Sequence, residues 1–80
     1  MDNNRRVKIG YLSGTFDLFH VGHLNLLRRA KAQCDYLIVG ISTDELVESY
    51  KHKTPIIPFD ERIAIVNGIR YVDRDRKSVV

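Results

Sequence analysis

The sequence predicts an α/β fold in which a parallel β-sheet carries helices on its faces. Three features predict it: a strand-like segment over 7–13, an amphipathic helical stretch behind a glycine-bearing loop, and a continuous apolar run over 36–41. A short run that is apolar throughout is typical of a parallel strand covered on both faces. The order strand, loop, helix, strand is that of a βαβ unit, whose crossover is expected to be right-handed.

The helix between these two strands is predicted by apolar residues at steps of three and four. This spacing places them on one face of the helix, which packs against the sheet, while polar and basic residues fill the opposite face. The stripe consists of Leu24, Leu27, Ala30 and Cys34, and Leu26 widens it.

A second, shorter helix is expected over 44–50. Ser42 and Glu45 have the spacing of a capping box, with Ser42 as the N-cap residue and Glu45 bonding back to it. The segment 51–58 that follows is predicted to be a loop, because it contains two prolines, which lack a backbone N–H.

The third helix is expected over 59–69. Two acidic residues lie in its first turn, where the helix dipole favours negative charge. A third strand after this helix completes a β-α-β-α-β order, with the strands in spatial order 3-2-1. This arrangement is one half of a doubly wound parallel sheet. The buried stripe of the third helix is expected to consist of Phe59, Ile63, Val66 and Ile69.

The predicted sheet has an open edge. The first strand has no segment within the 80 residues to pair with its outer side, although its apolar side chains indicate that it is covered. We therefore expect residues 1–80 to form a single, incomplete domain, whose sheet is completed by further chain or by a partner.

Composition and charge exclude several classes of protein. Hydrophobic residues make up 44% of the chain, which suits a packed core. No apolar run approaches the ~20 residues that cross a bilayer, no secretory signal precedes the first strand, and the single cysteine cannot form a disulfide within the chain. We therefore expect a cytoplasmic protein with no membrane partner. The 13 Lys and Arg are scattered among 10 Asp and Glu, which favours a small phosphorylated ligand over nucleic acid.

The most informative segment is the loop over 14–23, between the first strand and its helix. Ligands of such sheets bind beyond the carboxyl ends of the strands, and a helix start offers an anion N–H donors and a partial positive charge. His20 and His23 lie on the same side of the first helical turn, and Gly22 between them would let a phosphate or a base approach closely. The two imidazoles are expected to hold a transferring phosphoryl group.

Two other interpretations of this histidine pair are open. Zinc would need further ligands, and no cysteine or third histidine stands at metal-ligand spacing. The two rings could also do no more than cap or solvate the start of the helix.

This loop carries a family resemblance. Gly14-Thr15-Phe16-Asp17 followed by His20-Val21-Gly22-His23 resembles the signature loop of the cytidylyltransferase branch of the HxGH nucleotidyltransferases. Within this branch the sequence is most similar to glycerol-3-phosphate cytidylyltransferases, and the similarity spans about residues 7–73 in the family order. The resemblance implies a Rossmann-like nucleotidyltransferase fold, of which this chain resembles the N-terminal half.

The resemblance also implies an activity. CMP would be transferred from CTP, bound with Mg²⁺, to a small phosphate ester, with release of pyrophosphate; sn-glycerol 3-phosphate, giving CDP-glycerol, is the favoured acceptor. An ATP-using adenylyltransferase of the same fold and a non-catalytic nucleotide-binding half-domain are the alternatives. A homodimer is implied as well. No protein residue is expected to bind a metal.

The resemblance further implies roles for individual residues. Catalytic roles are expected for His20, His23 and Arg62, where the Arg62 guanidinium points at phosphate or, alternatively, is only a surface charge. Nucleotide contacts are expected from Gly14, Thr15, Phe16, His20, Val21, Gly22, His23 and Lys53. Acceptor contacts are expected from Asp17, Lys51 and Arg70. Alternatively, Asp17 holds its loop by accepting backbone N–H bonds, the lysines form a mobile cationic lid, and Arg70 complements a helix dipole.

The sequence departs from the family pattern in two places. Family members carry a second phosphate-binding motif, Arg-Thr-x-Gly-Ile-Ser-Thr, which is absent here, so we expect residues 1–80 alone to turn over CTP negligibly. The third strand of the family is apolar directly after Asp73, whereas this chain has the charged run Arg74-Asp75-Arg76-Lys77 at that place.

Overall fold

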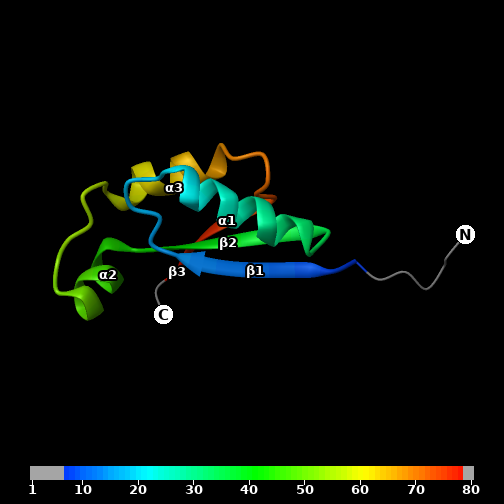
Figure 1. Ribbon diagram of the computed structural model, residues 1–80. Helices are drawn as coiled ribbons and strands as arrows, with labels where there is room; N and C mark the ends of the chain where they lie inside the picture. The colour runs from blue at the N-terminus through cyan, green and yellow to red at the C-terminus, as the bar shows by residue number, and fades with distance from the viewer. Residues whose placement is uncertain (1–6, 79–80) are drawn as a thin grey trace, which may run out of the picture.

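The computed structural model describes residues 7–78 (Figure 1). The three strands form one parallel sheet in the order β1-β2-β3, so the α/β architecture and the predicted strand order are confirmed. None of the helices in the described part has the length and apolarity that crossing a bilayer requires. The elements are β1 (Ile9–Gly14), α1 (Val21–Ala32), β2 (Tyr36–Ser42), α2 (Asp44–Lys51), α3 (Phe59–Asn67) and β3 (Arg74–Ser78).

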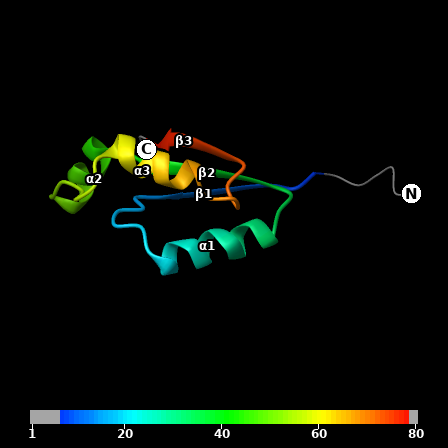
Figure 2. The same ribbon diagram turned by 90° about the horizontal axis from the view of Figure 1, so that it is seen from above.

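Helices α1 and α3 lie on the same face of the sheet, and α2 lies beyond the carboxyl end of β2 (Figures 1 and 2). Both crossovers advance across the sheet in the same direction, and right-handed connections then place both helices on one side. Side chains on the other face of β1, such as Ile9 and Tyr11, are more than half exposed.

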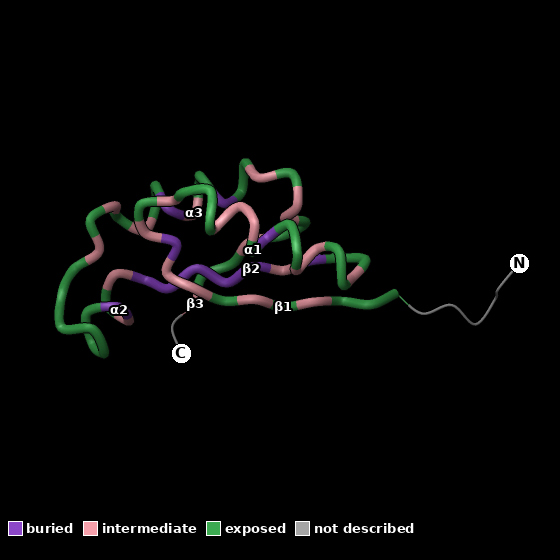
Figure 3. The backbone as a smooth tube through the Cα atoms, in the orientation of Figure 1, coloured by how far each residue is buried: buried purple, intermediate pink, exposed green. Residues whose placement is uncertain are grey.

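The hydrophobic core lies between β2 and these two helices. Leu37, Val39 and Ile41 alternate along β2 and are at most 1% exposed, and Leu27 of α1 and Val66 of α3 pack with them. Figure 3 shows the buried stretch along β2. The apolar stripes predicted for the first and third helices supply these contacts.

The charged run after Asp73 forms β3. The Asp73 backbone N–H donates to the Leu37 carbonyl at 3.0 Å, and the Asp73 carboxylate accepts the Leu37 N–H at 2.7 Å and pairs with Lys31 at 2.5 Å. The Lys31 ammonium and the Leu37 N–H lower the pKa of Asp73. These contacts begin the pairing of β3 with β2. An edge strand accommodates charged side chains, which is why a charged run takes the place of an apolar strand.

Helix α2 begins at Asp44, as predicted, but its N-cap residue lies one position after the predicted one. Thr43 is the N-cap, and its hydroxyl accepts the Leu46 N–H at 3.1 Å. The proposed cap, Ser42, is instead the last residue of β2 and is buried. The strand continues one residue further than the apolar run indicated, so the helix cap moves with it.

Candidate functional site

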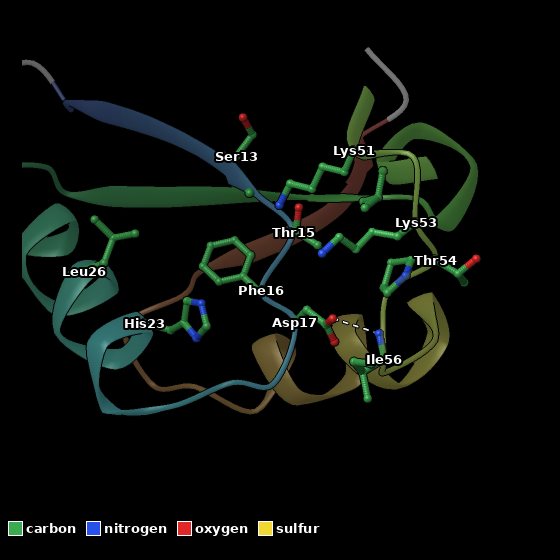
Figure 4. A pocket seen from close by; sticks show the side chains of 13 residues that line it. Ser13, Thr15, Phe16, Asp17, His23, Leu26, Lys51, Lys53, Thr54 and Ile56 are labelled. Atoms are coloured by element: carbon green, nitrogen blue, oxygen red, sulfur yellow. Dashed lines mark hydrogen bonds between the residues drawn. The ribbon is translucent and has the colours of Figure 1, made fainter. Parts of the chain in front are cut away.

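A cleft of about 550 Å³ opens beyond the carboxyl ends of the strands, within the size range of small-molecule sites (Figure 4). We call its two sides the histidine wall, residues 14–23, and the lysine wall, residues 51–57. The residues predicted for the site that line this cleft are Gly14, Thr15, Phe16, Asp17, His23, Lys51 and Lys53.

The two histidines cap α1 reciprocally. His20 is the N-cap residue, and its Nδ1 accepts the Gly22 N–H at 2.9 Å, while Nδ1 of His23 accepts the His20 N–H at 3.1 Å. The centroids of the two rings lie 4.1 Å apart. The rings are therefore neighbours, as their spacing predicts, and the interpretation of the pair as a helix cap is also confirmed.

Capping leaves each imidazole with one free donor. A neutral imidazole that accepts a hydrogen bond at Nδ1 carries its proton on Nε2, and the cap does not use that N–H. Burial, together with neighbouring His20, lowers the pKa of His23 and outweighs the opposite effect of Asp17. His23 is therefore neutral at neutral pH. Imidazole N–H donors at the positive end of a helix dipole are suited to an anion.

Gly22 is needed by the His20 ring. A Cβ atom on Gly22 would lie 2.6 Å from Cε1 of His20, closer than two such atoms approach one another. We expected the missing Cβ to admit a phosphate or a base. The structure corrects this: the space is occupied by the ring that caps the helix.

The loop before α1 contains two bulky residues in the left-handed region. Phe16 and Leu18 have φ angles of 54° and 51°, a conformation that is uncommon for large side chains. Phe16 is 5% exposed, and its ring centroid lies 5.6 Å from that of His23. Strained backbone of this kind persists only where its surroundings hold it, and it is concentrated at functional sites.

The lysine wall presents two cations to the cleft. Lys51 is the last residue of α2, and Lys53 stands two residues later. Both side chains extend across the cleft toward Thr15 (Figure 4). Within residues 7–78 neither ammonium has a carboxylate partner; the Lys51 ammonium lies 5.9 Å from the Tyr50 ring centroid. Unpaired cations beside a cleft raise the local concentration of anionic ligands.

Asp17 connects the two walls. Its carboxylate oxygens accept the backbone N–H groups of Ile56 at 2.8 Å and Ile57 at 2.9 Å. Burial alone raises the pKa of Asp17, but hydrogen bonds from Ile57, Ile56 and Leu18 and the charge of Arg62 outweigh it and hold the pKa below its ordinary value. The expectation that Asp17 accepts backbone N–H bonds is confirmed, and the N–H groups belong to the opposite wall.

Arg62 is fully buried behind the cleft. Its guanidinium donates to the carbonyls of Thr15 and Ser42, both at 2.7 Å, and to that of Ile57 at 2.8 Å, and it pairs with Asp44 at 2.6 Å. Thr15 and Ser42 stand where strands end, so their carbonyls need a partner from outside the sheet. This corrects both expectations for Arg62, because the guanidinium neither lines the cleft nor is a surface charge.

Arg70 does not take part in this cleft. Helix α3 runs back from the carboxyl end of the sheet, so the residues after it lie near the start of β2, where Asp73 pairs with Leu37 (Figure 1). The exposed Arg70 guanidinium donates to the Tyr71 hydroxyl at 3.1 Å, and this bond raises the pKa of Arg70.

Several residues that line the cleft were not predicted from the sequence. Leu26 was assigned to the buried stripe of the first helix, yet it is 39% exposed and faces the cleft. No spacing rule marks the others, because they converge from separate elements. Within residues 7–78, no three His, Cys, Asp or Glu side chains gather as metal ligands. The additional lining residues are Ser13, Leu26, Val47, Thr54, Pro55 and Ile56.

The sequence of this chain is similar to those of known nucleotidyltransferases. The chain is 50% identical over 60 residues to glycerol-3-phosphate cytidylyltransferase of Staphylococcus aureus, covering 75% of this chain and 45% of the relative. It is 42% identical over 73 residues to FAD synthase of Pyrococcus abyssi, covering 91% and 49%. The chain thus spans less than half the length of these relatives.

A solved structure agrees with this relationship. A lipopolysaccharide core biosynthesis protein of Thermoplasma volcanium superimposes with a TM-score of 0.85 at 27% identity, covering 91% of this chain and 59% of that one. The family model described as cytidylyltransferase-like matches residues 11–77, which include both walls of the cleft. The chain therefore belongs to the cytidylyltransferase-like family.

Proposed function

We propose that this protein acts as a nucleotidyltransferase that transfers CMP from CTP to a small phosphate ester, with sn-glycerol 3-phosphate as the preferred acceptor. An acceptor phosphate oxygen would bond to the α-phosphorus of CTP as the bond to the β-phosphate oxygen breaks. The products would be CDP-glycerol and pyrophosphate. Such a transfer proceeds by positioning and charge stabilisation, without a covalent intermediate on the protein.

The observation that carries this proposal is the His23 imidazole, which lines the cleft together with two unpaired lysines and has the His20 ring 4.1 Å away at the start of α1. The Nε2–H donors would bind the triphosphate, and Lys51 and Lys53 would offset the charge of the triphosphate and the acceptor phosphate. Among residues 7–78, Asp17 is the one carboxylate that lines this cleft, and backbone N–H groups already occupy its oxygens. Mg²⁺ would therefore arrive with CTP as part of the substrate.

Two alternatives to this function differ from it, one in the nucleotide donor and the other in the absence of turnover. The 42% identity to an FAD synthase supports ATP as an alternative donor. Because the chain spans less than half of its relatives, a module that binds nucleotide without turnover is the other alternative.

A thermal-shift series with CTP, ATP, UTP and GTP, each with Mg²⁺, tests the proposal. We expect CTP to raise the melting temperature most, and we expect His20→Ala and His23→Ala to abolish that rise. Pyrophosphate release with glycerol 3-phosphate then separates a transferase from a binding module. A larger rise with ATP would reassign the donor, and no rise with any nucleotide would overturn the proposal.

The implied homodimer stays a prediction. The outer edge of β1 has no strand beside it within residues 7–78, and Ile9 and Tyr11 on its uncovered face are exposed. These features support association of two copies. Light scattering over a range of protein concentrations tests it, and a monomer at the highest concentration would contradict it.

A further inference from the structure

The lysine wall has few contacts of its own. Most of its residues are exposed. Two hydrogen bonds join it to the preceding helix: the His52 N–H donates to the Glu48 carbonyl at 3.0 Å, and the Thr54 hydroxyl donates to the Glu48 carboxylate at 3.2 Å. The contacts that join it across the cleft are those with Asp17 and Arg62. Lys51 is held at the end of α2, whereas the position of Lys53, beyond that end, depends on those two residues.

The peptide groups of Ile57 are held from both sides. Its N–H donates to Asp17 Oδ1 at 2.9 Å, and its carbonyl accepts from Arg62 Nε at 2.8 Å. Arg62 also binds the carbonyl of Thr15, two residues before Asp17. Thr15, Asp17, Ile57 and Arg62 therefore form a closed ring of contacts that includes one segment from each wall.

We propose that Asp17 is a positioning residue, whose contacts with Ile56 and Ile57 hold Lys53 where it can reach a phosphate bound at the histidine wall. The phosphate part of this statement rests on the proposed function. Asp17 itself is not assigned a substrate contact, because both of its oxygens accept backbone N–H groups.

The chemistry of the contact requires a carboxylate. Two acceptor oxygens match two adjacent N–H donors, and hydrogen bonds to a charged acceptor are the stronger kind. An asparagine has the same shape but offers one acceptor oxygen, and its NH₂ group would face a backbone N–H. Asp17→Asn therefore breaks the contact while keeping the size of the side chain.

A double-mutant cycle on affinity for CTP with Mg²⁺ tests the coupling. We expect Asp17→Asn and Lys53→Ala each to weaken binding about tenfold, and the double variant to be no more than about tenfold weaker than wild type, since contacts that depend on each other are not additive. A double variant about a hundredfold weaker would overturn the proposal. The matched control is Asp60→Asn, which removes an exposed carboxylate outside the cleft and should leave affinity unchanged.

A second readout needs no nucleotide. Trypsin cleaves after lysine, so we expect Asp17→Asn to be cut after Lys51 and Lys53 about tenfold faster than wild type or Asp60→Asn, at a temperature where all are folded. An unchanged rate at these bonds would overturn the proposal. If wild type binds no CTP, the proposed function fails, while this measurement still decides whether Asp17 holds the wall.

Wild-type protein provides a further measurement if Asp17→Asn does not fold. Amide hydrogen exchange by NMR should show the N–H groups of Ile56 and Ile57 exchanging at least about tenfold more slowly than those of Lys53 and Thr54. Equal rates for all four would contradict the contact.

Discussion

The two walls of the cleft are held in different ways. At the histidine wall, the contacts that shape the start of α1 join His20 to residues two and three positions away. At the lysine wall, a contact joins Ile57 to Asp17, which stands 40 positions earlier in the chain. The first wall thus follows from local helix geometry, whereas the second exists only after the chain has folded. The following variants test this difference, the first at the network that joins the two walls and the others at the histidine wall.

The largest effect is expected from Arg62→Ala, which disrupts the lysine wall and the packing behind it. The change leaves three carbonyls and the Asp44 carboxylate without their guanidinium partner. Leaving a buried acceptor without its partner costs about 1–3 kcal/mol, so with three carbonyls affected we expect the free energy of unfolding in urea to fall by at least about 3 kcal/mol. Arg70→Ala, which removes an exposed guanidinium, is the control. Equal stability of the two variants would show that the buried network contributes little.

A smaller effect, chiefly on ligand binding, is expected from His23→Ala at the histidine wall. It removes one Nε2–H donor and the acceptor for the His20 N–H. Hydrogen bonds to a charged partner contribute about 1.5–3 kcal/mol, so affinity for CTP should fall about tenfold to a hundredfold. Isothermal titration calorimetry measures this. Wild-type affinity in the variant would exclude His23 from the binding site.

Gly22→Ala is expected to weaken binding while leaving stability nearly constant. The new Cβ would displace the His20 ring, and α1 would lose a helix cap worth about 1 kcal/mol. Alanine regains about 1 kcal/mol over glycine within the helix. The melting temperature should therefore change little, while affinity for CTP should fall several-fold. A large loss of stability with unchanged affinity would reverse the role assigned to this glycine.

The smallest effect is expected from pH. Burial and His20 hold the pKa of His23 below 6.5, so the folded protein binds fewer protons than the unfolded chain just below that pH. Stability should therefore fall as the pH drops from about 6.5 to about 5. His23→Gln keeps an acceptor at this capping-box position without titrating, so its melting temperature should fall less over the same range. Asp17 does not contribute there, since its pKa lies below 3.8.

Prediction from sequence succeeded where the signal is local. The βαβ order, the stripe that buries Leu27 and the proximity of His20 to His23 each follow from periodicity within a few residues, and all three are present. The sequence did not indicate that Arg62 is buried or that Arg70 lies away from the cleft, because both depend on where α3 begins and ends relative to the sheet. The third strand was predicted after the third helix, and the structure places it on the charged run 74–78, where an edge position and the contacts of Asp73 outweigh low apolar content.

The sequence by itself determined the order of the elements, the position of the loop before α1 and the side on which its two histidines lie. Backbone geometry repeats every two or 3.6 residues, so a few neighbouring side chains suffice to specify such features. Only the tertiary structure decided that Arg62 is buried and that Asp17 bonds to the opposite wall. Both depend on backbone groups left unpaired where strands and loops end, and folding alone brings those groups together.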